Sequence, residues 1–239
     1  MIAFIECGRR IRLRNKDANA SRGLGVIDGA VFGLMGLLLA FSFSGAESRF
    51  EGRRQLIVQE TNAIGTAYLR VDLLPEALQP QVRDDFRAYV DSRIRFYKEL
   101  TGERAQTLRN LAHSNELQKK VWIDTVAAAK QTGSPAVLSL TVSSLNEMID
   151  ITTVRLVALL THPPLLIYAT LVVLALSSAL IAGFGMGESA RRPLLHTLVY
   201  AVALTATIYT IMDLEFPRIG IVKVDRYDQV LIDQRKSMD

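Results

Sequence analysis

Side chains of the kinds that carry out catalysis or bind metals are scarce in this sequence of 239 residues. The three histidines, His113, His162 and His196, do not stand at metal-ligand spacing from one another. The single cysteine, Cys7, has no second cysteine with which to form a disulfide or a metal site. No paired acid and base and no nucleophile elbow stands out. We therefore expect no enzyme activity, no cofactor and no bound metal.

One glycine-rich run could be mistaken for a phosphate-binding loop. It covers Gly183–Gly187, but no strand precedes it and no lysine-containing helix start follows it. We interpret this run as a turn between two membrane spans.

The remaining charged and apolar residues could bind or conduct ions beside a membrane. Just after a charge-free window, apolar residues recur every seven positions at Phe43, Phe50, Ile57, Ile64 and Val71. This spacing is typical of a coiled-coil-like packing line on a helix, which we call the heptad line. In a pore, Phe43, Phe50 and Ile57 could form a constriction that gates by dewetting.

Charged and polar residues lie between the positions of the heptad line. Glu47, Arg49, Arg53, Arg54 and Asn62 could set the charge at the mouth of a pore. We therefore take Glu47, Arg54 and Asn62, with the three apolar residues, as the candidate pore-lining or gate positions.

A second interpretation of the same residues stays open. The heptad line could be the core of a helical bundle. In that case Arg49, Glu51, Arg54 and Glu60 would form salt bridges between subunits.

The distribution of charge limits the class of protein. The chain carries a net charge of +4, and 49% of its residues are hydrophobic. The short stretch Arg9–Arg22 holds six basic residues and one acidic residue, so it carries +5 and the rest of the chain sums to −1. A diffusely basic nucleic-acid binder is therefore excluded, and a membrane protein with one basic loop is favoured.

Three windows without charged residues are long enough to cross a bilayer, which takes about 20 helical residues. They are Gly29–Ala46, Leu156–Gly187 (divided by Pro163 and Pro164) and Pro193–Met212. Met1–Glu6 is apolar but too short, and we interpret it as the end of a further span. We predict an all-α integral membrane protein with three to four transmembrane helices and a long helical extramembrane region.

The predicted organisation follows the chain in order. It comprises an apolar remnant and basic loop at 1–23, a transmembrane helix at 24–46 that continues as one helix to about 73, a helical extramembrane domain at 47–162, transmembrane helices at 163–187 and 193–212, and a tail at 213–239. No proline interrupts the helix before Pro75.

Within the tail, Ile219–Val224 could form a short extended segment. A ladder of small residues, Gly25, Gly29, Gly33, Gly36, Ala40 and Ser44, predicts close packing against another helix.

Short basic loops predict the orientation in the membrane. Arg9–Arg22 and Glu188–Arg192 should both be cytoplasmic by the positive-inside rule. The middle domain and the C-terminal tail would then be extracytoplasmic, in a multi-pass protein of a bacterial inner membrane.

Several motifs resemble those of the bacterial bestrophin-like domain membrane proteins, in order along nearly the whole chain. They are Phe43–Arg54, Glu60–Arg70, Asp72–Pro75, Asn146–Asp150 and Asp213–Gly220. The resemblance assigns structural roles to the motif residues Arg49, Glu51, Arg53, Glu60, Arg70, Asp72, Asn146, Glu147, Asp150, Asp213, Pro217 and Arg218. The family usually has a full additional N-terminal span, of which Met1–Cys7 would be the remainder.

A more distant resemblance connects this family to true bestrophins, which are pentameric anion channels. It implies a homo-oligomeric ion channel, with anions favoured, in a lipid bilayer. The pore would follow a symmetry axis and be lined by the helix at about 25–73. In bestrophins the middle region is cytosolic, which is opposite to the placement from the basic loops. The alternative function is a non-conducting sensor or scaffold with an extracytoplasmic helical domain.

Overall fold

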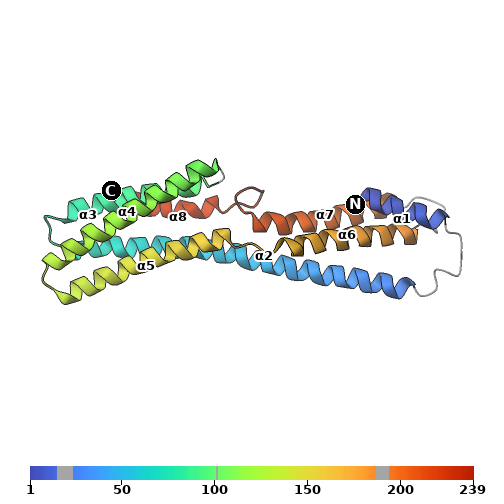
Figure 1. The fold of residues 1–239 in the computed structure, drawn as a ribbon, viewed down its shortest axis with the longest axis horizontal. Helices are drawn as coiled ribbons and strands as arrows, with labels where there is room; N and C mark the ends of the chain where they lie inside the picture. The colour runs from blue at the N-terminus through green and yellow to red at the C-terminus, as the bar shows by residue number, and fades with distance from the viewer. Residues whose placement is uncertain (15–23, 101, 187–193) are drawn as a thin grey trace. The chain divides into compact units, whose positions relative to one another are not determined.

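The computed structural model describes residues 1–14, 24–100, 102–186 and 194–239. These residues form two compact units. Unit 1 comprises Met1–Ser48 and His162–Phe216, and unit 2 comprises Arg49–Thr161 and Pro217–Asp239. Every regular element within the described ranges is a helix, which confirms the predicted all-α class (Figure 1). The basic residues beyond Arg14 and the loop Glu188–Arg192 lie outside the described residues.

The predicted long helix is confirmed. Helix α2 runs from Leu24 to Leu69 and is followed by one 3-10 turn, η2, at Arg70–Leu73. Its 46 residues correspond to about 70 Å at 1.5 Å per residue. Among the described residues, three helical stretches are long and apolar enough to cross a membrane: Gly25–Leu73, Pro135–Met186 and Leu194–Glu215.

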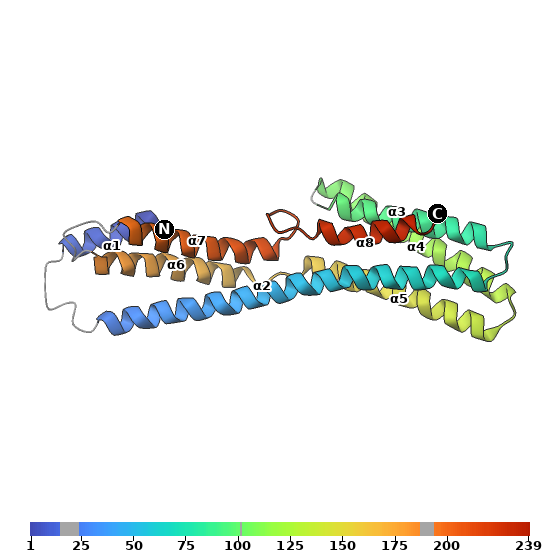
Figure 2. The ribbon, with the colours of Figure 1, turned by 180° about the vertical axis from the view of Figure 1, so that it is seen from behind.

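In unit 1, the first part of α2 is joined by three further helices: α1 (Ile2–Arg14), α6 (Leu165–Met186) and α7 (Leu194–Glu215). Figure 2 shows α1 beside α6 and α7. The crossing of α1 and α6 depends on two glycines. A Cβ atom on Gly183 would lie 2.8 Å from the Cα atom of Ile5, and one on Gly8 would lie 2.9 Å from the backbone nitrogen of Phe184. Close contact between the two backbones therefore requires glycine at both positions.

Two expectations for this part of the chain need correction. The basic residues up to Arg14 are helical, although we predicted a loop from Arg9, because Glu6 pairs with Arg9 and Arg10 one turn further along. The glycine-rich run is also helical as far as Met186, although we predicted a turn, because Gly183 lies at the crossing with α1.

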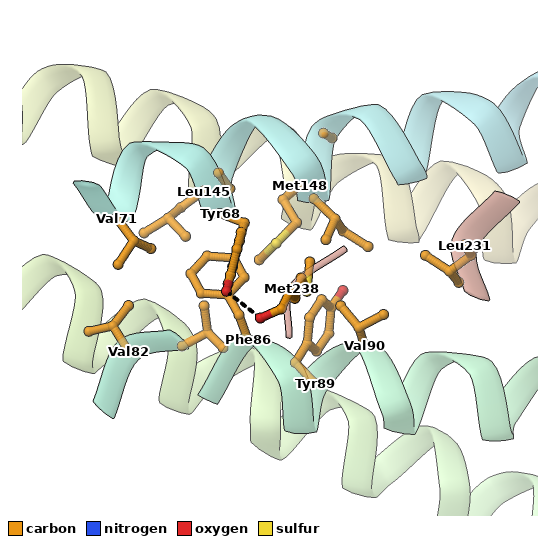
Figure 3. Packing of buried hydrophobic residues seen from close by; sticks show 14 of the residues in the cluster. Tyr68, Val71, Val82, Phe86, Tyr89, Val90, Leu145, Met148, Leu231 and Met238 are labelled. Carbon is orange, nitrogen blue, oxygen red and sulfur yellow. Dashed lines mark hydrogen bonds between the residues drawn. The ribbon is translucent and has the colours of Figure 1, made fainter. Parts of the chain in front are cut away.

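Unit 2 is a bundle of helices around one apolar core. The second part of α2 packs with α3 (Gln79–Lys98), α4 (Arg104–Gln131), α5 (Pro135–Leu160) and α8 (Asp225–Lys236). Figure 3 shows the core, in which Phe86, Tyr89 and Leu145 are at most 1% exposed. Helix α5 begins directly after Ser134, whose hydroxyl accepts a hydrogen bond from the backbone N–H of Val137 at 3.4 Å and so caps the helix.

The C-terminal tail is part of this core. We expected an extended segment at Ile219–Val224, but these residues form turns and bends, and helix α8 follows them. The reason lies in packing: Leu231 is fully buried and Met238 is 2% exposed. The Tyr68 hydroxyl donates a hydrogen bond to the Met238 carbonyl at 2.8 Å (Figure 3). The tail and the middle domain thus form one unit, as their predicted location on the same side of the membrane requires.

Candidate functional site

The heptad line changes its surroundings along α2. Phe43 is 43% exposed and Phe50 is half-buried, whereas Ile57 is 2% exposed and Ile64 and Val71 are fully buried. A heptad repeat falls short of two full turns of a straight α-helix by about 20° of rotation. The line therefore turns from the surface into the core of unit 2 over four heptads, and Ile57 does not present its side chain to a pore.

A different face of α2 is exposed along the whole helix. We call it the α2 face, and its members follow one another at intervals of three or four residues: Val26, Gly29, Gly33, Leu37, Ala40, Ser44, Glu47, Glu51, Gln55, Val58, Asn62, Thr66 and Leu69. All are exposed except Glu51, which is half-buried. Within unit 2 the opposite side of α2 is buried, so the helix is amphipathic there with a mostly polar outer face.

The charged candidates occupy different positions relative to the α2 face. Glu47 and Asn62 lie on it and are exposed. Arg54 lies at its edge, bound to the Glu51 carboxylate at 2.5 Å, with its guanidinium 4.1 Å from the ring centroid of Tyr227. Glu47 is therefore the fully exposed ionic group of this face.

Arg53 points into the protein rather than toward the α2 face. Its residue exposure is 6%, and it donates hydrogen bonds to the carbonyls of Ala158 at 3.1 Å and Thr161 at 3.0 Å. These are among the last carbonyls of α5, which have no partner within their own helix. Arg53 thus caps α5 and fixes it to α2. Its neighbour Arg49 is half-buried beside the groove between α2 and α5.

A buried ionic network surrounds Glu60, whose side chain is fully buried. Its carboxylate accepts hydrogen bonds from Arg93 Nε at 2.7 Å and from Arg155 Nη1 at 2.6 Å. The Tyr97 hydroxyl donates to the same carboxylate at 2.9 Å. The Arg155 guanidinium also lies 3.4 Å from the centroid of the Tyr97 ring. The salt bridges of Glu60 therefore lie within one chain, whereas the alternative interpretation of the heptad line placed them between subunits.

Two further residues extend this network to the C-terminal part of the chain. Asp228 accepts hydrogen bonds from Arg155 at 2.8 Å and from Arg218 at 3.0 Å. Arg218 also donates to the Tyr97 carbonyl at 3.1 Å. We call these six residues the Glu60 network, and it joins α2, α3, α5 and α8 with the segment that follows Phe216.

The charge states within the network follow from burial and pairing. Burial lowers the pKa of Arg93, but the charge and hydrogen bond of Glu60, together with Tyr97 and Tyr89, outweigh burial and hold the pKa above its ordinary value. Burial raises the pKa of the Tyr97 hydroxyl well above its usual range, and the charge of Glu60 adds to the increase. Arg93 is therefore charged and Tyr97 is a neutral hydrogen-bond donor.

A smaller cluster of charges lies between α3 and α4. Asp85 is 6% exposed, and its carboxylate accepts a hydrogen bond from Lys120. Burial raises the pKa of Asp85, although the bond from Lys120 acts in the opposite direction. Asp124 pairs with the same ammonium group at 3.0 Å.

The remaining motif residues differ in their surroundings. Arg70 donates to the Leu140 carbonyl and Asp72 pairs with Arg83. Asp213 and Pro217 are buried. The three motif residues of α5 are exposed: Asn146, Glu147 and Asp150. Among the described residues, no group of three or more His, Cys, Asp or Glu side chains could hold a metal ion.

Sequence reasoning missed Arg93, Tyr97, Arg155 and Asp228. A signal for two of them was present, because Arg93 and Arg155 occupy core positions of otherwise apolar helical faces. A charged residue at such a position needs a buried partner. Asp228 gives no such signal, because its helix is polar.

Comparison with known proteins identifies the family. A model of the Bestrophin-like domain matches residues 7–228. The chain belongs to this family. No curated protein matches it. Among solved structures, it is similar to a bacterial Bestrophin homolog from Klebsiella pneumoniae with 15% identity and a TM-score of 0.72, covering 98% of this chain and 97% of that one.

Other crystal structures agree. A variant of the Klebsiella pneumoniae homolog gives 13% identity and a TM-score of 0.76, covering 99% of this chain and 96% of that chain. At these identities the structural likeness shows the fold. Together with the apolar helices, the family assigns this Bestrophin-like chain to a membrane and supports a membrane channel in general terms.

Proposed function

We propose that this Bestrophin-like protein is a homo-oligomeric ion channel whose pore follows a symmetry axis and is lined by the α2 face. The observation that supports the proposal is the amphipathic character of α2 in unit 2. One side of the helix is buried in the core, and the exposed side carries Gln55, Asn62 and Thr66. One chain of this size is too small to enclose a hydrated pore, so several copies would surround it.

The membrane part of α2 supports self-association. Only 6% of its apolar window is buried inside the chain. At Gly25, Gly29, Gly33 and Gly36, no atom of the described chain lies within 4 Å of where a Cβ would stand. Small residues at this spacing allow helices to approach closely in lipid. We propose that these glycines let the α2 helices of neighbouring copies converge closely around the symmetry axis at the membrane end of the pore.

The charge of the α2 face bears on ion selectivity. Rings of carboxylates favour cations in channels, and Glu47 is the exposed ionic group here. The resemblance to bestrophins had favoured anions, whereas this face argues for cations. We therefore propose that a ring of Glu47 side chains makes the pore prefer cations.

Val58 is the proposed constriction. It is 42% exposed and stands between Gln55 and Asn62 on the polar part of the α2 face. A ring of apolar side chains in a narrow pore gates by dewetting. Val58 thus takes the role that the heptad line had suggested for Ile57.

The test is conductance of the purified protein in planar bilayers. Selective unitary currents are expected, with a reversal potential under a salt gradient that indicates cations and moves toward anions in Glu47→Gln. Val58→Ala should raise the unitary conductance, while Val154→Ala, which truncates an exposed valine of α5, should not. A bilayer that stays silent with folded protein would refute the channel and favour the sensor or scaffold. Anion selectivity in the unmodified protein would refute only the role of Glu47.

A further inference from the structure

A cavity of about 580 Å³ lies among α3, α4 and α5 in unit 2. This volume falls within the range of small-molecule binding sites, about 300–1,000 Å³. The lining residues used below are Arg93, Asn115, Lys119, Trp122, Ile149 and Leu156. The cavity belongs to no part of the proposed pore, because no residue of the α2 face lines it.

The innermost charged group of this cavity is a buried guanidinium. The side chain of Arg93 is 4% exposed, yet it lines the cavity. Its Nε binds Glu60 and its Nη2 binds the Tyr97 hydroxyl. Nη1 has no hydrogen-bond partner among the described residues. This nitrogen is not among the buried polar atoms that lack a partner, so a solvent molecule or a ligand in the cavity can reach it.

The charge of Arg93 is only partly balanced. Its counter-ion Glu60 also binds Arg155. Asp228 is likewise shared by Arg155 and Arg218, so two carboxylates serve three guanidinium groups in the Glu60 network. At the rim, Lys119 adds an exposed ammonium group. No aspartate or glutamate is among the residues that line the cavity. The electrostatic surroundings therefore favour a negatively charged occupant.

The rest of the wall is apolar. Trp122, Ile149 and Leu156 line it, and each is half-buried. Such a wall suits the hydrocarbon body of a ligand, and guanidinium groups are well matched to carboxylates in charge and geometry. We propose that this cavity binds a small organic carboxylate with an apolar, ring-sized body, whose carboxylate reaches Arg93 and Lys119.

Trp122 provides the readout, because it is the only tryptophan in the chain. The experiment titrates the full-length protein in detergent with benzoate and follows tryptophan emission. Benzamide, which has the same ring without the charge, is the matched ligand. We expect benzoate to change the emission saturably, with benzamide at least about tenfold weaker, as loss of one charge-assisted hydrogen bond implies.

The variants used to test benzoate binding leave the Glu60 network intact, so that a loss of binding does not result from unfolding. Lys119→Gln removes the rim charge, and Asn115→Phe fills part of the cavity from an exposed position on α4. Each should weaken benzoate binding about tenfold or more. Lys130→Gln, an exposed lysine of α4 that does not line the cavity, should leave it unchanged.

Three results would overturn the proposal. Equal binding of benzoate and benzamide would mean that the cavity recognises only an apolar body. Unchanged benzoate binding in both Lys119→Gln and Asn115→Phe would place the ligand elsewhere. An emission that does not respond to benzoate would mean that the cavity is closed to ligands, as it would be if a second copy of the chain covered it.

Discussion

The crossing of α1 and α6 allows a quantitative prediction for Gly183→Ala. The added Cβ would lie 2.8 Å from the Cα of Ile5, and it would meet backbone atoms that cannot rotate away. The carbonyl oxygen of Ile5 would be closer still, so the two helices would have to separate by more than about 1 Å to restore ordinary contact distances. Overpacking of this kind typically costs about 1–3 kcal/mol.

The same helix offers a matched control. Alanine is intrinsically more favourable than glycine in a helix by about 1 kcal/mol, which partly hides the cost of the clash. Gly185→Ala has the same intrinsic effect, and no atom of the described residues lies within 4 Å of its added Cβ. The difference between the two variants therefore isolates the clash at about 1–3 kcal/mol in favour of Gly185→Ala.

The assay is thermal unfolding of the purified protein in detergent, followed by the loss of the size-exclusion peak. A difference of 1 kcal/mol shifts the midpoint by about 2–4 °C in a protein of this size, so Gly183→Ala should melt about 2–12 °C below Gly185→Ala. Adding Gly8→Ala to Gly183→Ala should cost less than the sum of the two, because one separation of the helices relieves both clashes. Equal midpoints for Gly183→Ala and Gly185→Ala would refute the close crossing.

Three further predictions concern unit 2, and each is checked by unfolding midpoints. Glu60→Gln should destabilise the protein by about 3–5 kcal/mol, because it leaves the buried Arg93 without a carboxylate and Arg155 with Asp228 alone; a cost below about 1 kcal/mol would show that the network is not intact in solution. Ser134→Ala should cost about 1 kcal/mol through loss of the helix cap, and an unchanged midpoint would contradict the hydrogen bond that we describe. Burial raises the pKa of Asp85 in the folded state, so the stability that this group contributes is present below its unfolded pKa and is lost as the pH rises through the folded pKa. The midpoint of Asp85→Asn relative to the unmodified protein should therefore rise as the pH increases from about 4 to 7, and a difference that stays constant or falls would contradict the raised pKa.

Much of the fold was predictable from local signals. The bounds of α2 followed from the lack of proline before Pro75, and the start of α5 followed from Ser134 and Pro135. Such signals act within a few residues, so they survive in the folded protein. Helix α8 was not predicted, because its polar residues outnumber its apolar ones and Leu231 is buried only through contact with distant helices.

The candidate site was only partly predictable, for a geometric reason. The seven-residue period of Phe43, Phe50 and Ile57 is real, but in a straight helix it does not stay on one face. Exposure in the folded chain separates Glu47 and Asn62, which lie on the α2 face, from Ile57, which does not. The partners of Glu60 could not be found by spacing, since Arg155 is 95 residues away in the sequence.

The cap that Arg53 places on α5 limits how a pore lined by α2 could open. Turning α2 about its own axis within unit 2 would break both hydrogen bonds from Arg53 to Ala158 and Thr161. It would also pull Glu60 away from Arg93 and Arg155, and separating buried ions costs about 3–5 kcal/mol. Within unit 2, α2, α3 and α5 therefore move as one rigid body. Opening would come from side chains such as Val58 or from displacement of whole subunits, and rotation of the lining helix alone would not contribute.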